Sequence, residues 1–439
     1  MFKKILFKIY ELILFFDKSY GVKKYSLDEA SKIQNNILHD LINKSRYTKF
    51  GLEHDFKLIK SYKDFKNKVP TRDYEQFKNY IDLIKKGEKD ILWPGKPIYF
   101  AKTSGTTSGI KYIPVSKESI KNQVKSAGYL LFDYLKDKNS FESINGKAMF
   151  ISGSPSLVEE NGIKIGRLSG IVNHHEPFYL RGMLLPSKET NKIKNWEEKI
   201  EKIVEETIGE DLRVIGGIPP WIQMYFDFLI LKTGKKIKDI FPNLKLICHG
   251  GVNFEPYKSN LFNSIGKEID TLETFPASEG FFAYQNELKK NDLILQINSG
   301  IFYEFIDLEN LKSDYPKRIC IDDIEKNKNY SMILTTNSGL WSYEIGDTIK
   351  FTSLNPLKIR VTGRIKQYIS AFGEHVIVEE VDKSLKLACQ RFKEVKVIEY
   401  TVGPYISDEK GKSCHEWLVE FSSLPNDIKS FEKCLDENL

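Results

Sequence analysis

Apolar and charged positions alternate at helical spacing in the first part of the chain, between residues 26 and 84. The period of about 3.6 residues places apolar side chains on one face of each segment, which predicts several amphipathic helices. The segment VPTRDYEQF, residues 69–77, contains a helix start, with Thr71 or Asp73 as the capping residue. These helices precede the first strands. The apolar positions are Ile33, Ile37, Leu38, Leu41, Ile42, Tyr74, Phe77, Tyr80, Ile81 and Ile84.

A second pattern follows, in which short apolar runs end in glycine turns and lead into helices. Met149 to Ile151 precede the turn Ser152 to Pro155, and Arg213 to Ile215 precede Gly216 and Gly217. The run LKLICHGGVNF, residues 244–254, repeats the arrangement. This alternation predicts α/β units with ligand loops at the strand ends. The apolar stripe between Trp221 and Leu229 is interpreted as helix packing rather than as a ligand wall.

From about Ile269 strand-like runs dominate, which predicts a region of antiparallel β-structure. After Gly363 and Arg364 the chain returns to a mixture of strands and helices. The fold class is therefore α/β, with α/β units followed by a β-rich part and then a mixed α+β part at the C-terminus.

Composition narrows the class of protein without naming a function. The net charge of +6 is small against 66 basic and 60 acidic side chains, so nothing indicates nucleic acid. Five cysteines without a C-x-x-C pair indicate neither a disulfide scaffold nor a zinc site, and a cytoplasmic location fits. Residues 1–18 read as an amphipathic helix, and no stretch reaches the ~20 apolar residues of a membrane span.

The segment FAKTSGTTSGIKYIP, residues 100–114, is the strongest candidate for chemistry. It reads as strand, hydroxyl-and-glycine loop, strand. Glycines let backbone N–H groups converge, hydroxyls add donors and Lys111 adds charge, which suits a polyphosphate. Ordinary turn chemistry is the alternative. The loop is not a Walker loop, and no G-x-G-x-x-G fingerprint occurs in the chain.

Three further stretches join this loop: FPASE at residues 275–279, YEIGD at 343–347, and Gly363-Arg364 followed by ISAFGEH. Glu279 is either a capping carboxylate or an oxygen ligand for Mg²⁺. Asp347 is either a turn residue or an acceptor for two ribose hydroxyls. His249 and the pair His174 and His175 fit packed hydrogen-bonding groups better than catalytic bases, and we assign them no role.

Together these stretches resemble the auxin-responsive Gretchen Hagen family of acyl acid amido synthetases, within the adenylate-forming superfamily of acyl-CoA synthetases and luciferases. The resemblance covers most of the chain. Its segments are VPTRDYEQF, ILWPGKPIYFAKTSGTTSG, HGGVNFEPYK, ETFPASEGFFAYQ, LWSYEIGD, GRIKQYISAFGEHV and CHEWLVEF.

The resemblance implies a role for each motif. Phe275 stands where the family usually has an adenine-stacking Tyr, and Glu344 stands where many members have Arg. Arg364 matches the hinge between two domains. The resemblance implies a large N-terminal domain of α/β units plus a β-rich part at residues 1–361, and a small α+β C-terminal domain at residues 362–439. The implied phosphate loop comprises Thr103, Ser104, Gly105, Thr106, Thr107, Ser108 and Gly109. The turn that lines the adenine and acyl pockets comprises Gly250, Gly251 and Val252, and the group for Mg²⁺ and ribose comprises Ser278, Glu279 and Asp347. Of these residues, Thr106, Thr107 and Glu279 are the implied catalytic ones.

The implied activity uses ATP and Mg²⁺ to turn a carboxylic acid into an acyl adenylate, which an amino acid then attacks to give an amide. Two alternatives stay open: a phenylacetate-type acyl-CoA ligase, and a nucleotide-binding protein without turnover. The family continues beyond the point that matches Leu439 into a lysine-bearing segment. We therefore expect that the small domain is incomplete and that this chain forms acyl adenylate poorly. The acid, the amine and the oligomeric state stay open.

Overall fold

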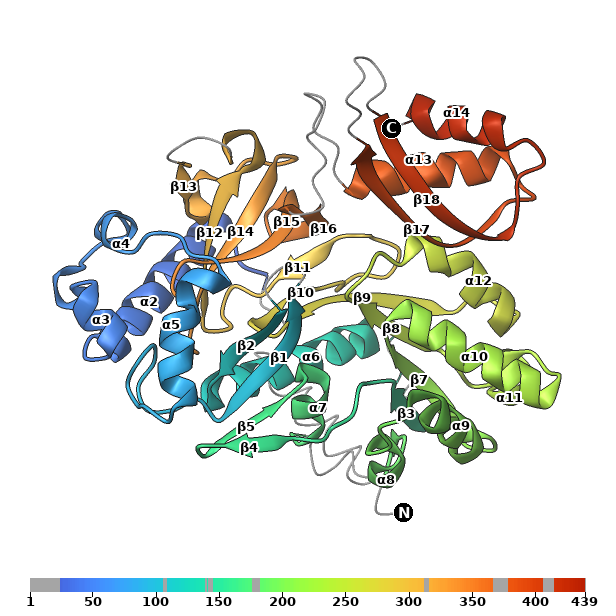
Figure 1. The fold of residues 1–439 in the computed structure, drawn as a ribbon, viewed down its shortest axis with the longest axis horizontal. Coiled ribbons are helices and arrows are strands. Elements are labelled where there is room, and N and C mark those ends of the chain that lie inside the picture. The colour runs from blue at the N-terminus through green and yellow to red at the C-terminus, as the bar shows by residue number, and fades with distance from the viewer. Residues whose placement is uncertain are drawn as a thin grey trace.

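The computed structural model describes residues 24–105, 109–138, 140, 145–175, 182–311, 316–365, 378–405 and 414–438. The predicted N-terminal helix at residues 1–18 lies outside these ranges. The architecture is mixed α/β, as predicted, and Figure 1 shows helices on both sides of one long sheet. No helix within the described ranges has the length and apolar character needed to cross a bilayer.

In the described residues the main sheet holds twelve strands, and its parallel half lies at one end. Neighbouring strands in this half run parallel because helical connections return the chain to the same edge. Their carboxyl ends therefore share one edge of the sheet. In spatial order the parallel strands are β6 (Leu184–Leu185), β3 (Lys147–Phe150), β7 (Leu212–Gly217), β8 (Leu246–Gly250) and β9 (Asp270–Ala277).

The other half of the sheet is antiparallel, and the change occurs at the hairpin between β9 and β10. Only Ser278 and Glu279 separate these two strands, a connection too short for a parallel crossover. The predicted change near Ile269 is thus confirmed. In spatial order the antiparallel strands are β10 (Gly280–Tyr284), β11 (Leu293–Leu295), β16 (Leu357–Arg364), β15 (Tyr343–Leu354), β14 (Asn329–Thr336), β12 (Ile301–Asp307) and β13 (Arg318–Ile319).

Two sets of helices cover the parallel half on opposite faces. The apolar residues of β8 alternate between them, since Ile247 packs in one core cluster and Leu246 in the other. On the first face lie α9 (Trp196–Thr207), α10 (Pro219–Thr233), α11 (Ile237–Ile240) and α12 (Glu255–Ile265), and on the second lies α6 (Lys117–Lys138). The predicted packing role of the stripe on α10 is confirmed, because Tyr225 and Leu229 are fully buried.

The N-terminal helices and a four-stranded sheet form the rest of the large body. Asp73 caps α5, since its side chain accepts from the Gln76 backbone N–H in a capping box, so the second predicted cap is the one used. The elements are α2 (Leu27–Ser45), α3 (Lys49–Glu53), α4 (Tyr62–Lys68), α5 (Tyr74–Lys85), α7 (Leu168–Asn173) and α8 (Lys188–Asn191), with strands in the order β2 (Gly109–Val115), β1 (Tyr99–Gly105), β5 (Ile163–Gly166) and β4 (Val158–Glu160).

The C-terminal segment has a core of its own, around Leu385 and Phe431. It contacts α12 through polar groups: Lys386 Nζ lies 2.8 Å from Glu255 Oε2, and the Tyr257 hydroxyl donates to Glu399 Oε1 at 3.3 Å. Figure 1 shows it in red, above α12. Its elements are α13 (Val378–Arg391), β17 (Lys396–Tyr405), β18 (Cys414–Ser423) and α14 (Ile428–Asn438). The expected boundary after residue 361 falls within β16 and stays a prediction.

Candidate active site

The predicted phosphate loop is the tip of the hairpin formed by β1 and β2. Thr103 pairs with Lys111 across the hairpin, and Gly105 pairs with Gly109. The two predicted strands are therefore present. Thr106, Thr107 and Ser108 at the tip lie outside the described residues.

Lys111 and Tyr74 anchor this hairpin to α5. The Tyr74 hydroxyl accepts from the Tyr112 backbone N–H at 2.8 Å, and Lys111 Nζ lies 5.6 Å from the centre of the Tyr74 ring. Lys111 forms no ion pair with any described residue. Its ammonium is thus held beside the loop, with its charge available to an anion.

Asp347 and Arg364 face each other across β15 and β16. Arg364 Nε donates to Asp347 Oδ1 at 2.7 Å; the arginine side chain is 61% exposed and the aspartate side chain only 6%. The glycines that precede them, Gly346 and Gly363, have φ of +88° and +140°, a region that favours glycine. Burial raises the pKa of the Asp347 carboxyl, whereas the Arg364 and Lys111 charges lower it.

Glu279, at the tip of the hairpin between β9 and β10, completes the group. Its side chain is buried, and burial raises the pKa of its carboxyl to about 7, with the Asp347 charge adding to the rise. The charges of Lys111 and Arg364 act in the opposite direction. Residues from all four sequence motifs therefore interact electrostatically at one place.

Glu279 suits a divalent cation for two reasons. The carboxyl is buried without an ion-pair partner among the described residues, so a cation would relieve its desolvation. Second, the described residues contain no group of three or more His, Cys, Asp or Glu side chains that could hold a metal ion by themselves. Mg²⁺ commonly binds through one or two carboxylates plus substrate phosphates rather than in an all-protein cage, which agrees with this donor set.

The turn after β8 packs closely on β9. A Cβ on Gly250 would lie 2.4 Å from the Thr274 carbonyl oxygen, so only glycine fits without a shift. Gly251 has φ of +84°, and Val252 is 40% exposed. This turn therefore lies against the residue that precedes Phe275, at the shared carboxyl edge of the parallel strands.

Phe275 belongs to the core of the antiparallel half. Its ring is 9% exposed and meets Phe282 edge-to-face at 5.1 Å. Ser278, in the turn beside Glu279, is half-buried. The ring offers little free surface here, so adenine stacking on Phe275 stays a prediction.

Of the three histidines that were assigned no role, His249 is buried, His175 is half-buried and His174 is exposed. His249 is 4% exposed and stacks on Phe254 at 4.0 Å, and burial lowers the pKa of its imidazole to about 3. His174 Nε2 lies 3.0 Å from the Pro155 carbonyl oxygen, and His175 Nε2 lies 3.0 Å from the Tyr99 hydroxyl. A neutral His249 cannot serve as a cationic group near pH 7.

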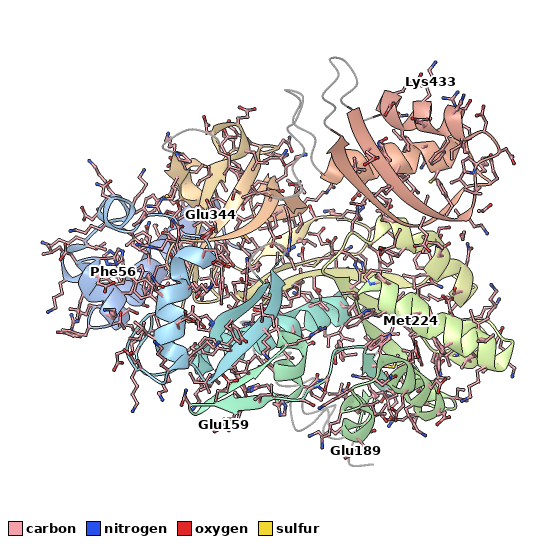
Figure 2. All side chains as sticks on the ribbon, in the orientation of Figure 1. Phe56, Glu159, Glu189, Met224, Glu344 and Lys433 are labelled. Carbon is pink, nitrogen blue, oxygen red and sulfur yellow. The ribbon has the colours of Figure 1, made fainter. Side chains whose placement is uncertain are left out.

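Sequence reasoning missed a backbone connection that closes the site from the N-terminal side. The Arg72 N–H donates to the Ser342 carbonyl at 3.1 Å, and the Glu344 N–H donates to the Arg72 carbonyl at 2.8 Å. Glu344, labelled in Figure 2, is half-buried, and burial together with the Asp73 charge raises its pKa. No local signal could reveal a pairing between segments so far apart in the chain.

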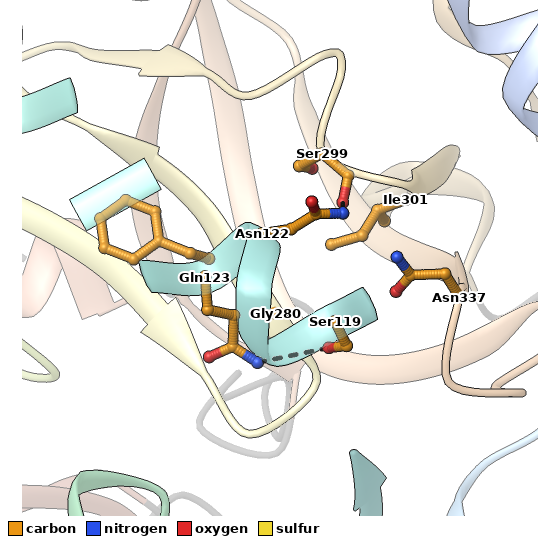
Figure 3. A pocket seen from close by; sticks show the side chains of 8 residues that line it. Ser119, Asn122, Gln123, Gly280, Ser299, Ile301 and Asn337 are labelled. Atoms are coloured by element: carbon orange, nitrogen blue, oxygen red, sulfur yellow. Dashed lines mark hydrogen bonds between the residues drawn. The ribbon is translucent and has the colours of Figure 1, made fainter. Parts of the chain in front are cut away.

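A small cavity lies next to Gly280, the residue that follows Glu279 in the chain (Figure 3). Asn122 and Ser119 of α6 line it together with Ser299 and Asn337, and Asn122 Nδ2 donates to the Ser299 carbonyl at 2.7 Å. Its volume of about 10 Å³ corresponds to one water-sized sphere, which is too small for a nucleotide or an acyl group.

Comparison with solved structures places the fold in the adenylate-forming class. An acyl acid amido synthetase, AtGH3.15 in complex with 2,4-DB, is similar over 93% of this chain and 83% of its own, with a TM-score of 0.77 and 15% identity. A 2-hydroxyisobutyryl-CoA ligase in the postadenylation state is similar over 90% and 78%, with a TM-score of 0.60 and 11% identity.

The family follows from the domain matches. The GH3 family N-terminal domain matches residues 24–194 and the GH3 family central domain matches residues 294–364, together more than half of the chain. The chain belongs to the GH3 family. Among curated relatives, jasmonoyl–L-amino acid synthetase JAR4 of Nicotiana attenuata is 20% identical over 96% of this chain and 85% of its own. Indole-3-acetic acid-amido synthetase GH3.4 of Arabidopsis thaliana is 21% identical over 92% and 80%.

Proposed function

We propose that this protein is a ligase that activates a carboxylic acid with ATP as an acyl adenylate and then transfers the acyl group to an amino acid. In the first step an acid oxygen attacks the α-phosphorus and pyrophosphate leaves. In the second, the amine attacks the acyl carbonyl, AMP leaves and the ammonium proton is released. One observation carries the proposal: Lys111, Glu279, Asp347 and Arg364, from four separate motifs, meet at one place.

The tip of the β1–β2 hairpin binds the β- and γ-phosphates in this proposal, and later the leaving pyrophosphate. Backbone N–H groups and hydroxyls from Thr103 to Gly109 donate to the phosphate oxygens. Lys111, fixed beside the loop by Tyr74, supplies positive charge where negative charge develops. Phosphoryl chemistry of this kind depends on positioning and charge neutralisation rather than on a protein nucleophile.

Asp347 accepts hydrogen bonds from the ribose hydroxyls. Arg364 holds one of its carboxylate oxygens, Oδ1, which orients the carboxylate and leaves it further acceptor capacity. Arg364 lies at the end of β16, next to the segment that leads to α13. The arginine thereby connects the nucleotide site to the proposed hinge between residues 1–361 and 362–439.

Glu279 is the residue that would hold Mg²⁺, in company with the nucleotide phosphates. The ion would neutralise phosphate charge during adenylation. Gly250, Gly251 and Val252 would line the adenine and acyl pockets from the β8 end, with Phe275 and Ser278 on the β9 side. We also infer a cytoplasmic location from the cysteine usage.

Incubation of the purified protein with ATP, Mg²⁺ and a panel of carboxylic acids, followed by pyrophosphate exchange and product analysis, tests the proposal. We expect acid-dependent exchange, and an amide when amino acids are added. Product only with coenzyme A would replace the amide reaction with thioester formation. Measurable ATP binding without exchange for any acid would identify a nucleotide-binding protein without turnover.

A further inference from the structure

Lys199 on α9 is a buried lysine outside the groups described above. Its side chain is only 2% exposed, and Nζ donates to the carbonyl oxygens of Ser152 at 2.9 Å and of Asn191 at 3.1 Å. A longer contact of 3.5 Å reaches the Gly153 carbonyl. An ammonium has three N–H donors, so three backbone carbonyls can satisfy it.

No carboxylate of the described residues forms an ion pair with Lys199. Burial lowers the pKa of its ammonium to about 8. The side-chain Oδ1 of Asn191 is also buried, without a hydrogen-bond partner in the described part of the chain. Burying a lysine ammonium costs free energy, and its contacts with three backbone carbonyls offset part of that cost.

The contacts of Lys199 join three segments at the carboxyl edge of the parallel strands. Ser152 and Gly153 follow β3, Asn191 ends α8, and Lys199 lies in the first turn of α9. β3 pairs with β7, and the chain after β3 is held there by the hydrogen bond from the Ile151 N–H to the Gly216 carbonyl. This edge is where a ligand of an open α/β sheet binds.

The segment Ser152–Pro155, called here the β3-exit loop, packs against α7. Asn173 Nδ2 donates to Ser152 Oγ at 3.3 Å, and a Cβ on Gly170 would lie 2.7 Å from the Ser154 carbonyl oxygen. Beyond α7, His175 contacts the Tyr99 hydroxyl at the start of β1. Contacts therefore run from Lys199 through the β3-exit loop and α7 to Tyr99, at the end of β1 that lies away from the phosphate loop.

We propose that Lys199 is a positioning residue that fixes the β3-exit loop, and through it α7, as a wall of the carboxylic-acid site. The inference rests on the proposed function. The nucleotide groups Glu279, Asp347 and Arg364 lie on the far side of β8 and β7 in the sheet order, so loss of Lys199 affects use of the acid more than use of ATP.

Lys199→Ala tests the proposal, with Lys202→Ala as the matched control. Lys202 is on the same helix, but its side chain is exposed and pairs with Glu205 at 2.8 Å. We expect Lys199→Ala to raise the KM for the acid in pyrophosphate exchange about tenfold to a hundredfold, the scale of a small misplacement, with the KM for ATP within about twofold. Lys202→Ala should change neither value.

Chemical rescue distinguishes positioning from general stability. n-Propylammonium replaces the atoms that Lys199→Ala removes and can donate to the same carbonyls, so it should restore the KM for the acid. Tetramethylammonium at the same concentration, which cannot donate, should not. An equal rise of both KM values without rescue would overturn the proposal, because it indicates general destabilisation.

Hydrogen exchange gives a readout that does not depend on activity. In Lys199→Ala the amides of the β3-exit loop and α7 should exchange faster than in the wild type, and n-propylammonium should reverse the change. Unchanged exchange there would contradict the proposal. If Lys199→Ala does not fold, Lys199→Met keeps the packing and serves for the KM and hydrogen-exchange measurements, without the rescue, because its side chain fills the space that n-propylammonium would occupy. If the wild-type protein shows no pyrophosphate exchange, the ligase proposal is refuted. Hydrogen exchange of the backbone amides still tests whether Lys199 fixes the β3-exit loop and α7.

Discussion

Arg364 Nε donates to Asp347 Oδ1 at 2.7 Å, across adjacent strands that end at the candidate site. The pair joins the last residue of β16 to a carboxylate that is almost wholly buried. The arginine is mostly exposed, so a ligand or a movement of the C-terminal segment can reach it. In the proposed function, this pair therefore connects nucleotide binding to the segment that leads into α13.

Asp347→Asn should weaken ATP binding by about 1.5–3 kcal/mol, the scale of a hydrogen bond to a charged group. The amide keeps the shape but loses the charge and one acceptor. Isothermal titration with ATP measures the change, and Asp323→Asn, at an exposed position, is the control. Unchanged affinity with an intact fold would remove Asp347 from the nucleotide site.

Glu279→Gln should impair adenylation mainly through Mg²⁺. The amide removes an anionic oxygen ligand, so the Mg²⁺ concentration for half-maximal exchange should rise, while folding is retained. Protons compete for the same oxygens in the wild type. Its Mg²⁺ requirement should therefore increase as the pH falls below about 7, the pKa of the buried carboxyl. Normal exchange by the variant at limiting Mg²⁺ would contradict this assignment.

Glu279 also makes stability depend on pH in the ligand-free protein. Its pKa is raised to about 7, against 4.5 for an ordinary glutamate. Between these values the folded carboxyl keeps a proton that the unfolded one has lost, so stability falls as the pH rises from about 4.5 to about 7. The accumulated loss is on the order of 3 kcal/mol. Glu279→Gln should therefore raise the unfolding midpoint at pH 8 but hardly at pH 4.5, and equal shifts at both would argue against a raised pKa.

Gly250→Ala should disturb the turn after β8. The new Cβ would lie 2.4 Å from the Thr274 carbonyl, and backbone atoms cannot move aside as a flexible side chain can. We expect weaker ATP binding and slower exchange, because the turn lies beside Phe275. Gly403→Ala, where a Cβ meets nothing within 4 Å, is the control. Equal activity of the two variants would show that the turn does not shape the site.

Thr106→Ala and Thr107→Ala should each slow adenylation by about tenfold to a thousandfold if the hydroxyls contact developing phosphate charge. Single-turnover adenylate formation is the measurement, because it isolates this step from release of product. Thr401→Ala, at an exposed position on β17, is the control. Rates equal to the wild type in both variants would remove these hydroxyls from the transition state.

Local sequence patterns determined the elements of this protein and the order in which they occur. Local patterns predicted α5 with a cap at Thr71 or Asp73, of which the structure uses Asp73, the strands around the phosphate loop and the change to antiparallel structure at β9. These features depend on residues close together in the chain, because helix caps, turns and strand alternation are local interactions. The motifs and the family resemblance followed from the same short stretches.

Tertiary structure decided which of those stretches meet. The order of strands in the sheet, which has twelve strands in the described residues, aligns Asp347 with Arg364 and buries Glu279. Arg72 forms its backbone hydrogen bonds with Ser342 and Glu344 for the same reason. The pKa of Glu279 likewise follows from surroundings contributed by distant segments. A sequence pattern reports the residues next to one another in the chain, whereas desolvation and charge act through space between residues that only folding brings together.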